Sequence, residues 1–244
     1  MRADGPSALS ELAIVGIEQN SPAAPDNFAL ARLDPQVEVD KQKADAMSMP
    51  FGNAAIEAPR EDIALKWRDL QAHINADINA VASCETQKAV CSQAMHRFSS
   101  IVELGKKKSG RIQIGWINRA VNLSIRPMSD WAQYGFADVW ASPLQTLSSG
   151  AGDCEDYAAV KYAILRVLGF ATDDLRFVIV QDSRLQTEHA VVAVRYDNEW
   201  TILDNRTMTI FHPQQAGNYR PLYVLDEQDN RAFKTATLDP LTIR

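Results

Sequence analysis

A cysteine surrounded by carboxylates is the most chemically suggestive feature of the sequence. In the stretch GAGDCEDYA, at the expected start of a helix, Cys154 is flanked by Asp153, Glu155 and Asp156. A helix N-terminus lowers the pKa of a thiol because it stabilises the thiolate, whereas neighbouring carboxylates raise that pKa. Cys154 is therefore either a buried structural residue or a nucleophile whose acidic neighbours have a separate role.

The acids themselves fit the start of a helix. Asp153 suits the N-cap position, and Asp156, three residues later, suits an acidic variant of the capping box. Cys154 would then lie in the first helical turn, where its own N–H can donate to an oxyanion. Gly150 and Gly152 permit close approach of the backbone to this turn. The alternative is that the acids act as caps and nothing else.

A histidine and an aspartate that could activate the thiol lie on a predicted β-hairpin. The segments HAVVAVRY and EWTILDN alternate like strands and are joined by a two-residue DN turn. If Tyr196 pairs with Glu199, then His189 and Asp204 are diagonal neighbours on one face, roughly 7–8 Å apart. A histidine oriented by a carboxylate is the general-base half of a Cys-His-Asp triad. A structural histidine with satisfied hydrogen bonds is the alternative.

The elements that must position these residues follow from the hydrophobic periodicity. A one-faced helix is expected after Pro59, and its inward positions are Ile63, Trp67, Leu70, Ile74, Ile78 and Val81. Further helices are expected over 92–105, 111–124 and 153–168, and strands over 175–182, 189–196, 199–205 and 220–227. Helices followed by antiparallel strands predict an α+β fold, with the nucleophile-bearing helix packed on the sheet. Residues 126–152 are expected to form a long irregular connection, a kind of segment that is usually functional.

The composition limits the class of protein to which the chain can belong and the kinds of partner that it can bind. The 244 residues are 46% hydrophobic and 23% charged, which is typical of a globular protein. A net charge of −6 gives no basic surface for nucleic acid. No apolar run reaches the roughly 18–20 residues that a membrane span needs. Six prolines and no sustained period over residues 1–60 predict a disordered or loosely attached tail over 1–58.

The other two cysteines, Cys84 and Cys91, are candidates for a disulfide. In a continuous helix a spacing of seven residues corresponds to about 10.5 Å along the axis, which is too long for an S–S bond. They can be bridged only if the chain turns between the first two helices, and the pattern supports such a turn. A zinc site is the weaker alternative, because no second CxxC or HxxxH motif accompanies them.

Three blocks of the sequence resemble one known family. They are NRAVNLSIRPMSD (118–130), WASPLQTLSSGAGDCEDYAAVKYAILRVLG (140–169) and HAVVAVRYDNEWTILDN (189–205). In this order they are similar to the bacterial transglutaminase-like cysteine peptidases, which include the LapG-type periplasmic proteases. The resemblance covers roughly residues 60–230. It implies a papain-like or transglutaminase-like domain over 59–232, followed by a C-terminal tail over 233–244.

The resemblance also implies roles for individual residues. It assigns Cys154 as nucleophile, His189 as general base and then acid, and Asp204 as the orienting carboxylate. Trp140, in the loop before the helix, is expected to supply a second oxyanion donor or to form a wall of the cleft; plain core packing is the alternative.

Calcium is the cofactor that the resemblance implies, because LapG-type enzymes bind it through acids beside the nucleophile. Asp153 and Glu155 match those positions, and Asp156 is a further candidate. Without a cation, three carboxylates oppose thiolate formation, whereas a divalent ion held by several oxygen ligands reverses that effect.

The function that follows from the resemblance is cleavage of a large adhesin-like surface protein in biofilm control. An inner-membrane cyclic-di-GMP receptor that sequesters the protease is the implied partner. The implied location is the periplasm, although the first residues lack the basic region and apolar core of a signal peptide. The competing hypotheses are a transglutaminase or amidase with the same triad, and a non-catalytic peptide-binding module.

Overall fold

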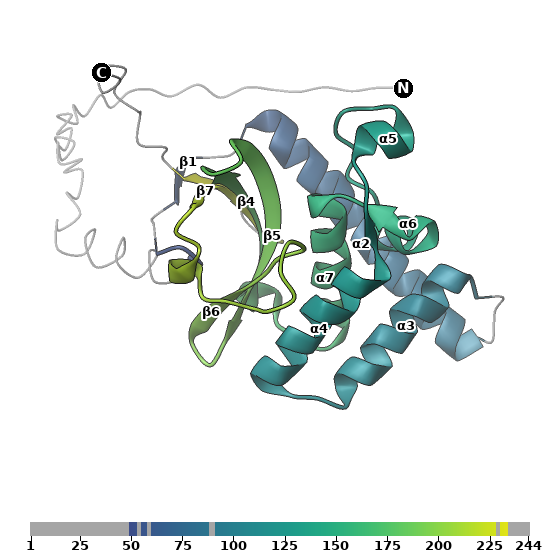
Figure 1. The fold of residues 1–244 in the computed structure, drawn as a ribbon. Helices are drawn as coiled ribbons and strands as arrows, with labels where there is room; N and C mark the ends of the chain where they lie inside the picture. Colours follow the sequence, from purple (N-terminus) through teal and green to yellow (C-terminus); the bar gives the residue numbers. More distant parts are fainter. Residues whose placement is uncertain (1–48, 53–54, 58–59, 88–90, 228–229, 234–244) are drawn as a thin grey trace, which may run out of the picture.

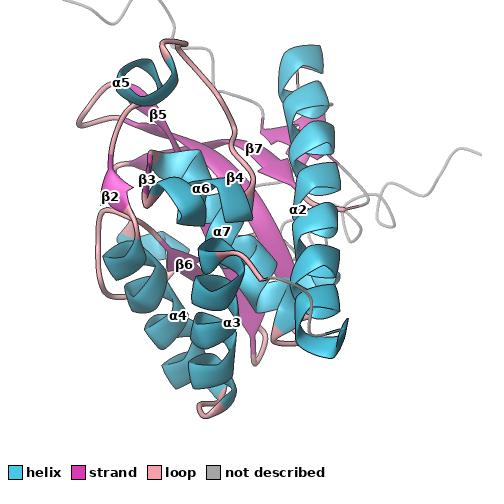
Figure 2. Cartoon of the chain, turned by 90° about the vertical axis from the view of Figure 1, so that its right-hand side faces the viewer, coloured by secondary structure: helices cyan, strands magenta, loops and turns pink. Residues whose placement is uncertain are grey.

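A computed structural model describes residues 49–52, 55–57, 60–87, 91–227 and 230–233. In it, helices cover one face of a six-stranded antiparallel sheet, in the strand order β1-β8-β7-β4-β5-β6 (Figures 1 and 2). The helices are α2 (Glu61–Gln87), α3 (Gln93–Lys106), α4 (Gly110–Ser124), α5 (Asp130–Tyr134), α6 (Pro143–Ser149) and α7 (Cys154–Val167). The strands of this sheet are β1 (Ala55–Glu57), β4 (Leu175–Asp182), β5 (Thr187–Tyr196), β6 (Glu199–Leu203), β7 (Tyr219–Leu225) and β8 (Asn230–Phe233). This is the α+β fold that the pattern of elements predicted.

The helix that begins with Cys154 lies at the centre of the molecule. Figure 2 shows α7 between the sheet and the outer helices, and it contacts β5, α4, α6 and α2. Ala158, Ala159 and Ala163 are buried on it, and such small side chains let the neighbouring elements approach closely. Because α7 is enclosed on all sides, its N-terminus is held in a fixed position relative to β5.

The first long helix, α2, packs its predicted apolar face against this core. Glu61 and Asp62 occupy its first turn, where the helix dipole favours acids. Trp67 is fully buried, and its ring packs against Tyr162 of α7 and Phe177 of β4 at centroid distances of 5.5 and 5.1 Å. The tryptophan therefore joins α2, α7 and the sheet in one hydrophobic core.

The β5–β6 hairpin has the register that the sequence predicted. Tyr196 pairs with Glu199, and the ladder continues to a pair between Val192 and Leu203. Asp197 and Asn198 both have positive φ, at 54° and 61°, as a two-residue type I′ turn requires. β5 extends beyond this ladder and includes His189, whereas the chain leaves the ladder after β6 ends at Leu203.

Residues 126–152 contain more regular structure than the expected irregular connection. Ser129 and Ser142 accept hydrogen bonds from N–H groups in the first turns of α5 and α6. Gly135 and Gly150 end these two helices in the left-handed conformation. Two short parallel strands, β2 (Arg126–Pro127) and β3 (Ala151–Gly152), close the segment on itself. Helices of five and seven residues show too little periodicity to be predicted from pattern, although their caps are visible.

The N-terminal boundary of the domain was predicted too late in the chain. Residues 55–57 form β1, which pairs with β8, and Met49 is buried against the outer face of the sheet. These residues belong to the folded domain rather than to a loosely attached tail. The rest of the predicted tail, up to residue 48, lies outside the described residues, as does 234–244. Among the described helices, none is both long and apolar enough to cross a membrane.

A disulfide joins the end of α2 to the segment before α3. Cys84 and Cys91 are bonded, with their Cα atoms 5.6 Å apart. The chain reverses between the two helices, which is the condition under which the sequence allowed this bond. Cys154 is the remaining cysteine and carries a free thiol.

Candidate active site

Cys154 is the first residue of α7, and the acids around it build this helix end. The carboxylate of Asp156 accepts hydrogen bonds from the backbone N–H groups of Asp153, at 3.3 Å, and Ala141, at 3.0 Å. A side chain at Gly152 would collide with Asp156, since a Cβ there would lie 2.4 Å from a carboxylate oxygen. The predicted close approach of the backbone at this glycine is therefore present.

His189 and Asp204 form a buried pair at the end of the β5–β6 hairpin. Nε2 of His189 lies 2.9 Å from Oδ1 of Asp204, and each residue is only 1% exposed. Asp204 also accepts hydrogen bonds from the N–H of Arg206, at 2.9 Å, and the hydroxyl of Tyr219, at 2.7 Å. Burial alone would raise the pKa of Asp204, but the hydrogen bond and charge of His189 outweigh it and lower the pKa to about 2. The carboxylate is therefore charged throughout the neutral range.

Cys154 and His189 line the same pocket, which has a volume of about 320 Å³. While Nε2 is occupied by Asp204, Nδ1 of His189 is buried without a hydrogen-bond partner in the described part of the chain. An imidazole held at one nitrogen and open at the other, in a pocket shared with a thiol, can accept a proton from that thiol.

The thiol is not activated by its protein surroundings alone. Burial raises the pKa of Cys154 well above its usual range, and the charge of Glu155 raises it further. The Cys154 thiol donates a hydrogen bond to Glu155 Oε2 at 3.2 Å, while the backbone N–H of Ala190 partly counters these effects. Without a compensating positive charge, the sulfur is therefore held in its protonated form.

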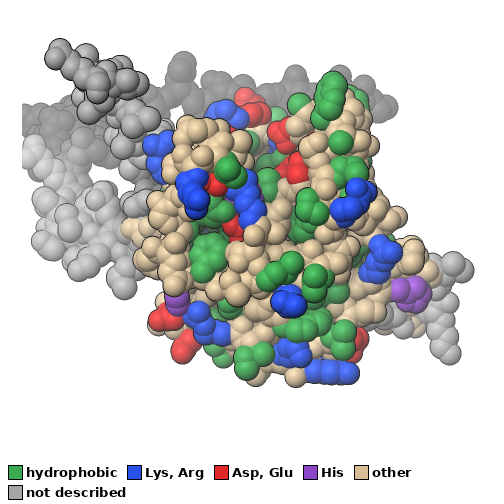
Figure 3. Space-filling view, viewed as in Figure 1, with side chains coloured by type: hydrophobic (Ala, Val, Ile, Leu, Met, Phe, Trp, Pro, Cys, Tyr) green, Lys and Arg blue, Asp and Glu red, His purple; other side chains and the backbone are tan. Residues whose placement is uncertain are grey.

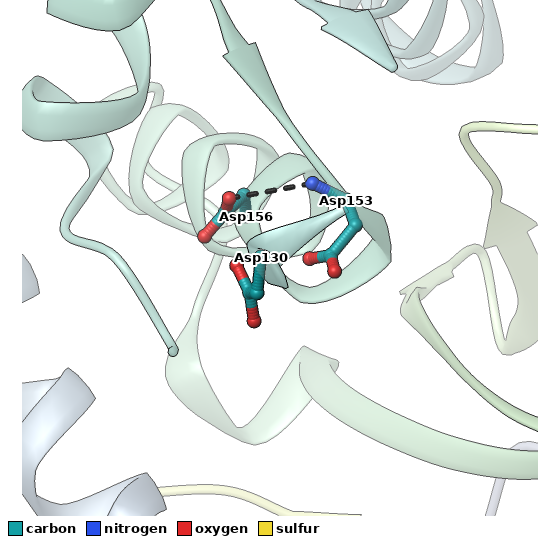
Figure 4. Close-up of side chains that lie close together, drawn as sticks. All are labelled: Asp130, Asp153 and Asp156. Carbon is teal, nitrogen blue, oxygen red and sulfur yellow. Dashed lines mark hydrogen bonds between the residues drawn. The ribbon is translucent and has the colours of Figure 1, made fainter. Parts of the chain in front are cut away.

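Carboxylates from two segments converge beside this thiol. One group consists of Asp130, Asp153 and Asp156, and a second consists of Asp130, Asp138 and Glu155; within each group, one carboxylate oxygen per residue lies within 4.8 Å of the others. Figure 4 shows the three aspartates of the first group directed toward one another. On the face shown in Figure 3, acidic side chains gather in the recess between α5 and the β4–β5 turn.

The chemistry of these acids fits a hard divalent cation. Burial raises the pKa of Asp130, Asp153 and Glu155, and it raises that of Asp156 to about 7. One oxygen each of Asp130 and Asp153 is buried without a hydrogen-bond partner among the described residues. Buried carboxylates that repel one another and leave oxygen atoms unpaired are the donor set that Ca²⁺ accepts.

Comparison with protein-family models identifies the family of the chain. A family model of the bacterial transglutaminase-like cysteine proteinases matches residues 71–237, more than half of the chain. The chain belongs to this family. The matched range contains all three candidate triad residues. The protein is therefore a transglutaminase-like cysteine peptidase, and its substrate is a protein.

Solved structures give the same result for the fold. The calcium-bound LapG of Legionella pneumophila is 25% identical, with a TM-score of 0.54, and the match covers 64% of this chain and 88% of that one. The EGTA-treated LapG of the same organism is 24% identical, with a TM-score of 0.53, over 68% of this chain and 88% of that one. A search of curated proteins finds no significant match.

Trp140 of this cysteine peptidase lines the pocket, but its indole N–H is engaged elsewhere. That N–H donates to Asp138 at 3.0 Å, and the ring packs against Phe177 at a centroid distance of 5.4 Å. Lys66 forms an ion pair with Asp138 on the same side. The Trp140 ring therefore lies in the pocket lining and packs on the core, and its indole N–H is paired with Asp138.

Several residues around the peptidase site were not found from sequence. Asp130 and Asp138 join the acidic groups from the segment before α6, and the only available signal was their position in a long ordered connection. Asn122 of α4 donates to the backbone carbonyl of Asp204 at 2.8 Å, which fixes the turn after β6. The Tyr219 ring packs against the His189 ring at 5.6 Å. No local pattern predicts such contacts between distant segments.

A buried lysine lies two helical turns beyond Cys154. Lys161 of α7 is 1% exposed, and burial lowers its pKa to about 7 while the charge of Asp204 opposes that shift. Its ammonium lies 5.9 Å from the centre of the Tyr157 ring. The core behind the candidate triad therefore contains a lysine that is only partly protonated near neutral pH, and the charge of Asp204 favours its protonated form.

Proposed function

We propose that this peptidase is a calcium-dependent endopeptidase that uses Cys154, His189 and Asp204 as its catalytic triad. The observation that carries the proposal is the buried His189, which is bonded to Asp204 through Nε2 and shares a pocket with Cys154. The unpaired Nδ1 is the atom that exchanges a proton with the thiol. Asp204 fixes the tautomer and the orientation of the ring.

The reaction transfers an acyl group from a peptide nitrogen to sulfur and then to water. The thiolate of Cys154 attacks the peptide carbonyl carbon, and the N–H of Cys154 stabilises the oxyanion. His189 delivers the thiol's proton to the departing amine as the C–N bond breaks, which leaves a thioester. It then takes a proton from water, whose oxygen attacks the thioester, and the products are a carboxylate and the free thiol.

Calcium is held, in this proposal, by Asp153, Glu155 and Asp156, with Asp130 and Asp138 from the preceding segment. When bound, the ion supplies the positive charge that these acids lack and thereby lowers the pKa of Cys154. The calcium-bound LapG of Legionella pneumophila supports this cofactor by resemblance. We extend the proposal to a periplasmic location, an adhesin-like substrate and sequestration by a cyclic-di-GMP receptor on the family resemblance of the three sequence blocks alone.

The test of the triad uses a peptide library made by digesting a whole proteome, with cleavage products identified by mass spectrometry. We expect the wild-type protein with calcium to cut the library and Cys154→Ala to lose all cleavage while its circular dichroism spectrum stays unchanged. Products that carry one added water distinguish hydrolysis from amine transfer. Equal cleavage by wild type and Cys154→Ala would disprove the triad.

The test of calcium compares activity in calcium with activity in excess EGTA. We expect EGTA to abolish cleavage, and Asp153→Asn to shift the calcium requirement to concentrations at least tenfold higher because it removes one charged ligand. Asp62→Asn is the matched control, since Asp62 is also a first-turn acid but lies on α2 and is exposed. Undiminished turnover in EGTA would rule out the calcium requirement and leave the triad untouched.

A further inference from the structure

A lysine of α2 reaches one of the acids of the proposed calcium site. Lys66 forms an ion pair with Asp138, which lies 72 positions later in the chain. Asp138 shares its acidic group with Asp130 and Glu155, and one carboxylate oxygen of each lies within 4.8 Å of the others. The side chains of Lys66 and Asp138 are 33% and 52% exposed, so solvent reaches both of them. A positive charge that belongs to the chain itself is therefore already bound to this acidic group.

Both carboxylate oxygens of Asp138 accept hydrogen bonds. Oδ2 accepts from the ammonium of Lys66, and Oδ1 accepts from the indole N–H of Trp140 at 3.0 Å. Asp130 differs, because its Oδ1 is buried without a hydrogen-bond partner among the described residues, while its Oδ2 accepts from the N–H of Val139. Calcium takes oxygen ligands, and an ammonium group binds the same lone pairs of a carboxylate. Asp138 therefore has to release a partner, or share an oxygen, before it can coordinate the ion.

Of the two partners of Asp138, Lys66 is the one that opposes a cation. The indole of Trp140 is uncharged, so its N–H can stay on Oδ1 while Oδ2 coordinates an ion. The ammonium of Lys66 binds Oδ2 itself, and its positive charge repels a divalent ion at the same carboxylate. The ammonium also lies 5.9 Å from the centre of the Trp140 ring, a distance at which the ring attracts a cation. A lysine released from Asp138 therefore still has a favourable position beside this ring.

We propose that Lys66 competes with calcium for Asp138. Its ammonium holds this carboxylate in the calcium-free protein and releases it when the ion binds, so that the lysine lowers the affinity of the site for calcium. This inference rests on the proposed calcium site, and it concerns the regulation of that site. An ion pair that only fastens α2 to the pocket wall has a different consequence: its loss would destabilise the protein without tightening the binding of calcium.

The experiment measures the Kd for calcium by isothermal titration calorimetry on the full-length protein, after EGTA treatment and dialysis. We expect Lys66→Met to bind calcium about fivefold more tightly than wild type, because an exposed ion pair contributes a factor of up to about five and its loss favours the ion. Lys66→Arg keeps the charge and should bind calcium as wild type does. Unfolding of each calcium-free variant, followed by circular dichroism, shows whether the protein stays folded.

The matched control is Lys106→Met, which removes the same charge at a distance from the site. Lys106 lies on α3 in an ion pair with Glu103, and it belongs neither to the acidic groups nor to the pocket lining. We expect its Kd to equal that of wild type. Asp138→Asn should weaken the binding of calcium, and in that background Lys66→Met should lose most of its effect, because the lysine acts through this carboxylate.

An unchanged or higher Kd in Lys66→Met, or the same gain in the presence and absence of the Asp138 carboxylate, would overturn the proposal. Neither result would affect the triad or the calcium requirement, which are measured by cleavage. Absence of any calcium binding by wild type would instead count against the proposed calcium site itself, so the two failures are distinguishable.

Discussion

At the scale of single residues, the site depends on how completely Asp204 is saturated with donors. Its carboxylate accepts from the imidazole of His189, the backbone N–H of Arg206 and the hydroxyl of Tyr219. These hydrogen bonds restrict the rotation of the Asp204 carboxylate. The carboxylate in turn fixes the orientation of the His189 imidazole. Because Nε2 is fixed in this way, Nδ1 remains the nitrogen that can serve the thiol.

Removal of the Tyr219 hydroxyl tests this positioning role. We expect Tyr219→Phe to lower kcat for peptide cleavage by about tenfold with little change in KM, since one hydrogen bond to a charged group contributes about 1.5 kcal/mol. The ring that packs on His189 is retained, so the loss of stability should be limited to this one hydrogen bond, about 1.5 kcal/mol, and the protein should stay folded. Tyr196→Phe, a half-exposed tyrosine of the β5–β6 hairpin, is the control. Equal loss in both variants would contradict the role.

At the scale of elements, the segment between α4 and α7 brings Asp130 and Asp138 close to Cys154. The pairing of β2 with β3 returns this segment to the start of α7, with the N–H of Arg126 donating to the carbonyl of Gly150 at 2.9 Å. Gly152 leaves room for Asp156, and a cap residue begins each short helix. The site is thus built on the N-terminus of one rigid helix and on a segment closed by backbone hydrogen bonds.

The disulfide that joins α2 to the segment before α3 also contributes at the level of elements. Closing the short loop between Cys84 and Cys91 limits the unfolded chain, so we expect the Cys84→Ser, Cys91→Ser protein to lose about 2–3 kcal/mol of stability. Its cleavage activity should be retained, because the bond lies far along α2 from the pocket. Mass spectrometry before and after reduction detects the bond, and denaturant unfolding measures its effect. Full stability of the double variant would refute this contribution.

At the scale of the whole molecule, the fold brings carboxylates that repel one another together at one site. Asp156 illustrates the consequence for stability. Burial raises its pKa from an ordinary 3.8 to about 7, so between these values the folded chain holds a proton that the unfolded chain has lost. The stability of the cation-free protein therefore falls as the pH rises through this range, by an amount on the order of a few kcal/mol.

Thermal unfolding in EGTA and in calcium checks this expectation between pH 4 and 7. We expect Tm in EGTA to fall as the pH rises, and the gain in Tm from calcium to grow over the same range, because the ion replaces the proton. Asp156→Asn should reduce this dependence in EGTA, and the part that remains comes from Asp130, Asp153 and Glu155, whose pKa values burial also raises. A Tm that rises with pH in the absence of calcium would contradict the linkage.

The sequence by itself determined the features that arise from local periodicity. The helical face of α2 and the turn at Asp197 follow from residues close together in the chain. The hairpin register brought His189 and Asp204 together, because a two-residue turn fixes every later pair. The start of the helix that carries Cys154 could be predicted for the same reason, since caps act within one turn.

Only the tertiary structure decided which distant groups meet around that framework. Asp130 and Asp138 reach the acids of α7 because β2 and β3 pair, and no period in the sequence encodes that pairing. Tyr219 lies on Asp204 because β7 pairs with β4, which is a choice of strand order. The indole N–H of Trp140 pairs with Asp138 because the packing of this segment places the two side chains together. Such contacts depend on the packing of whole elements, and packing is not a local property of the chain.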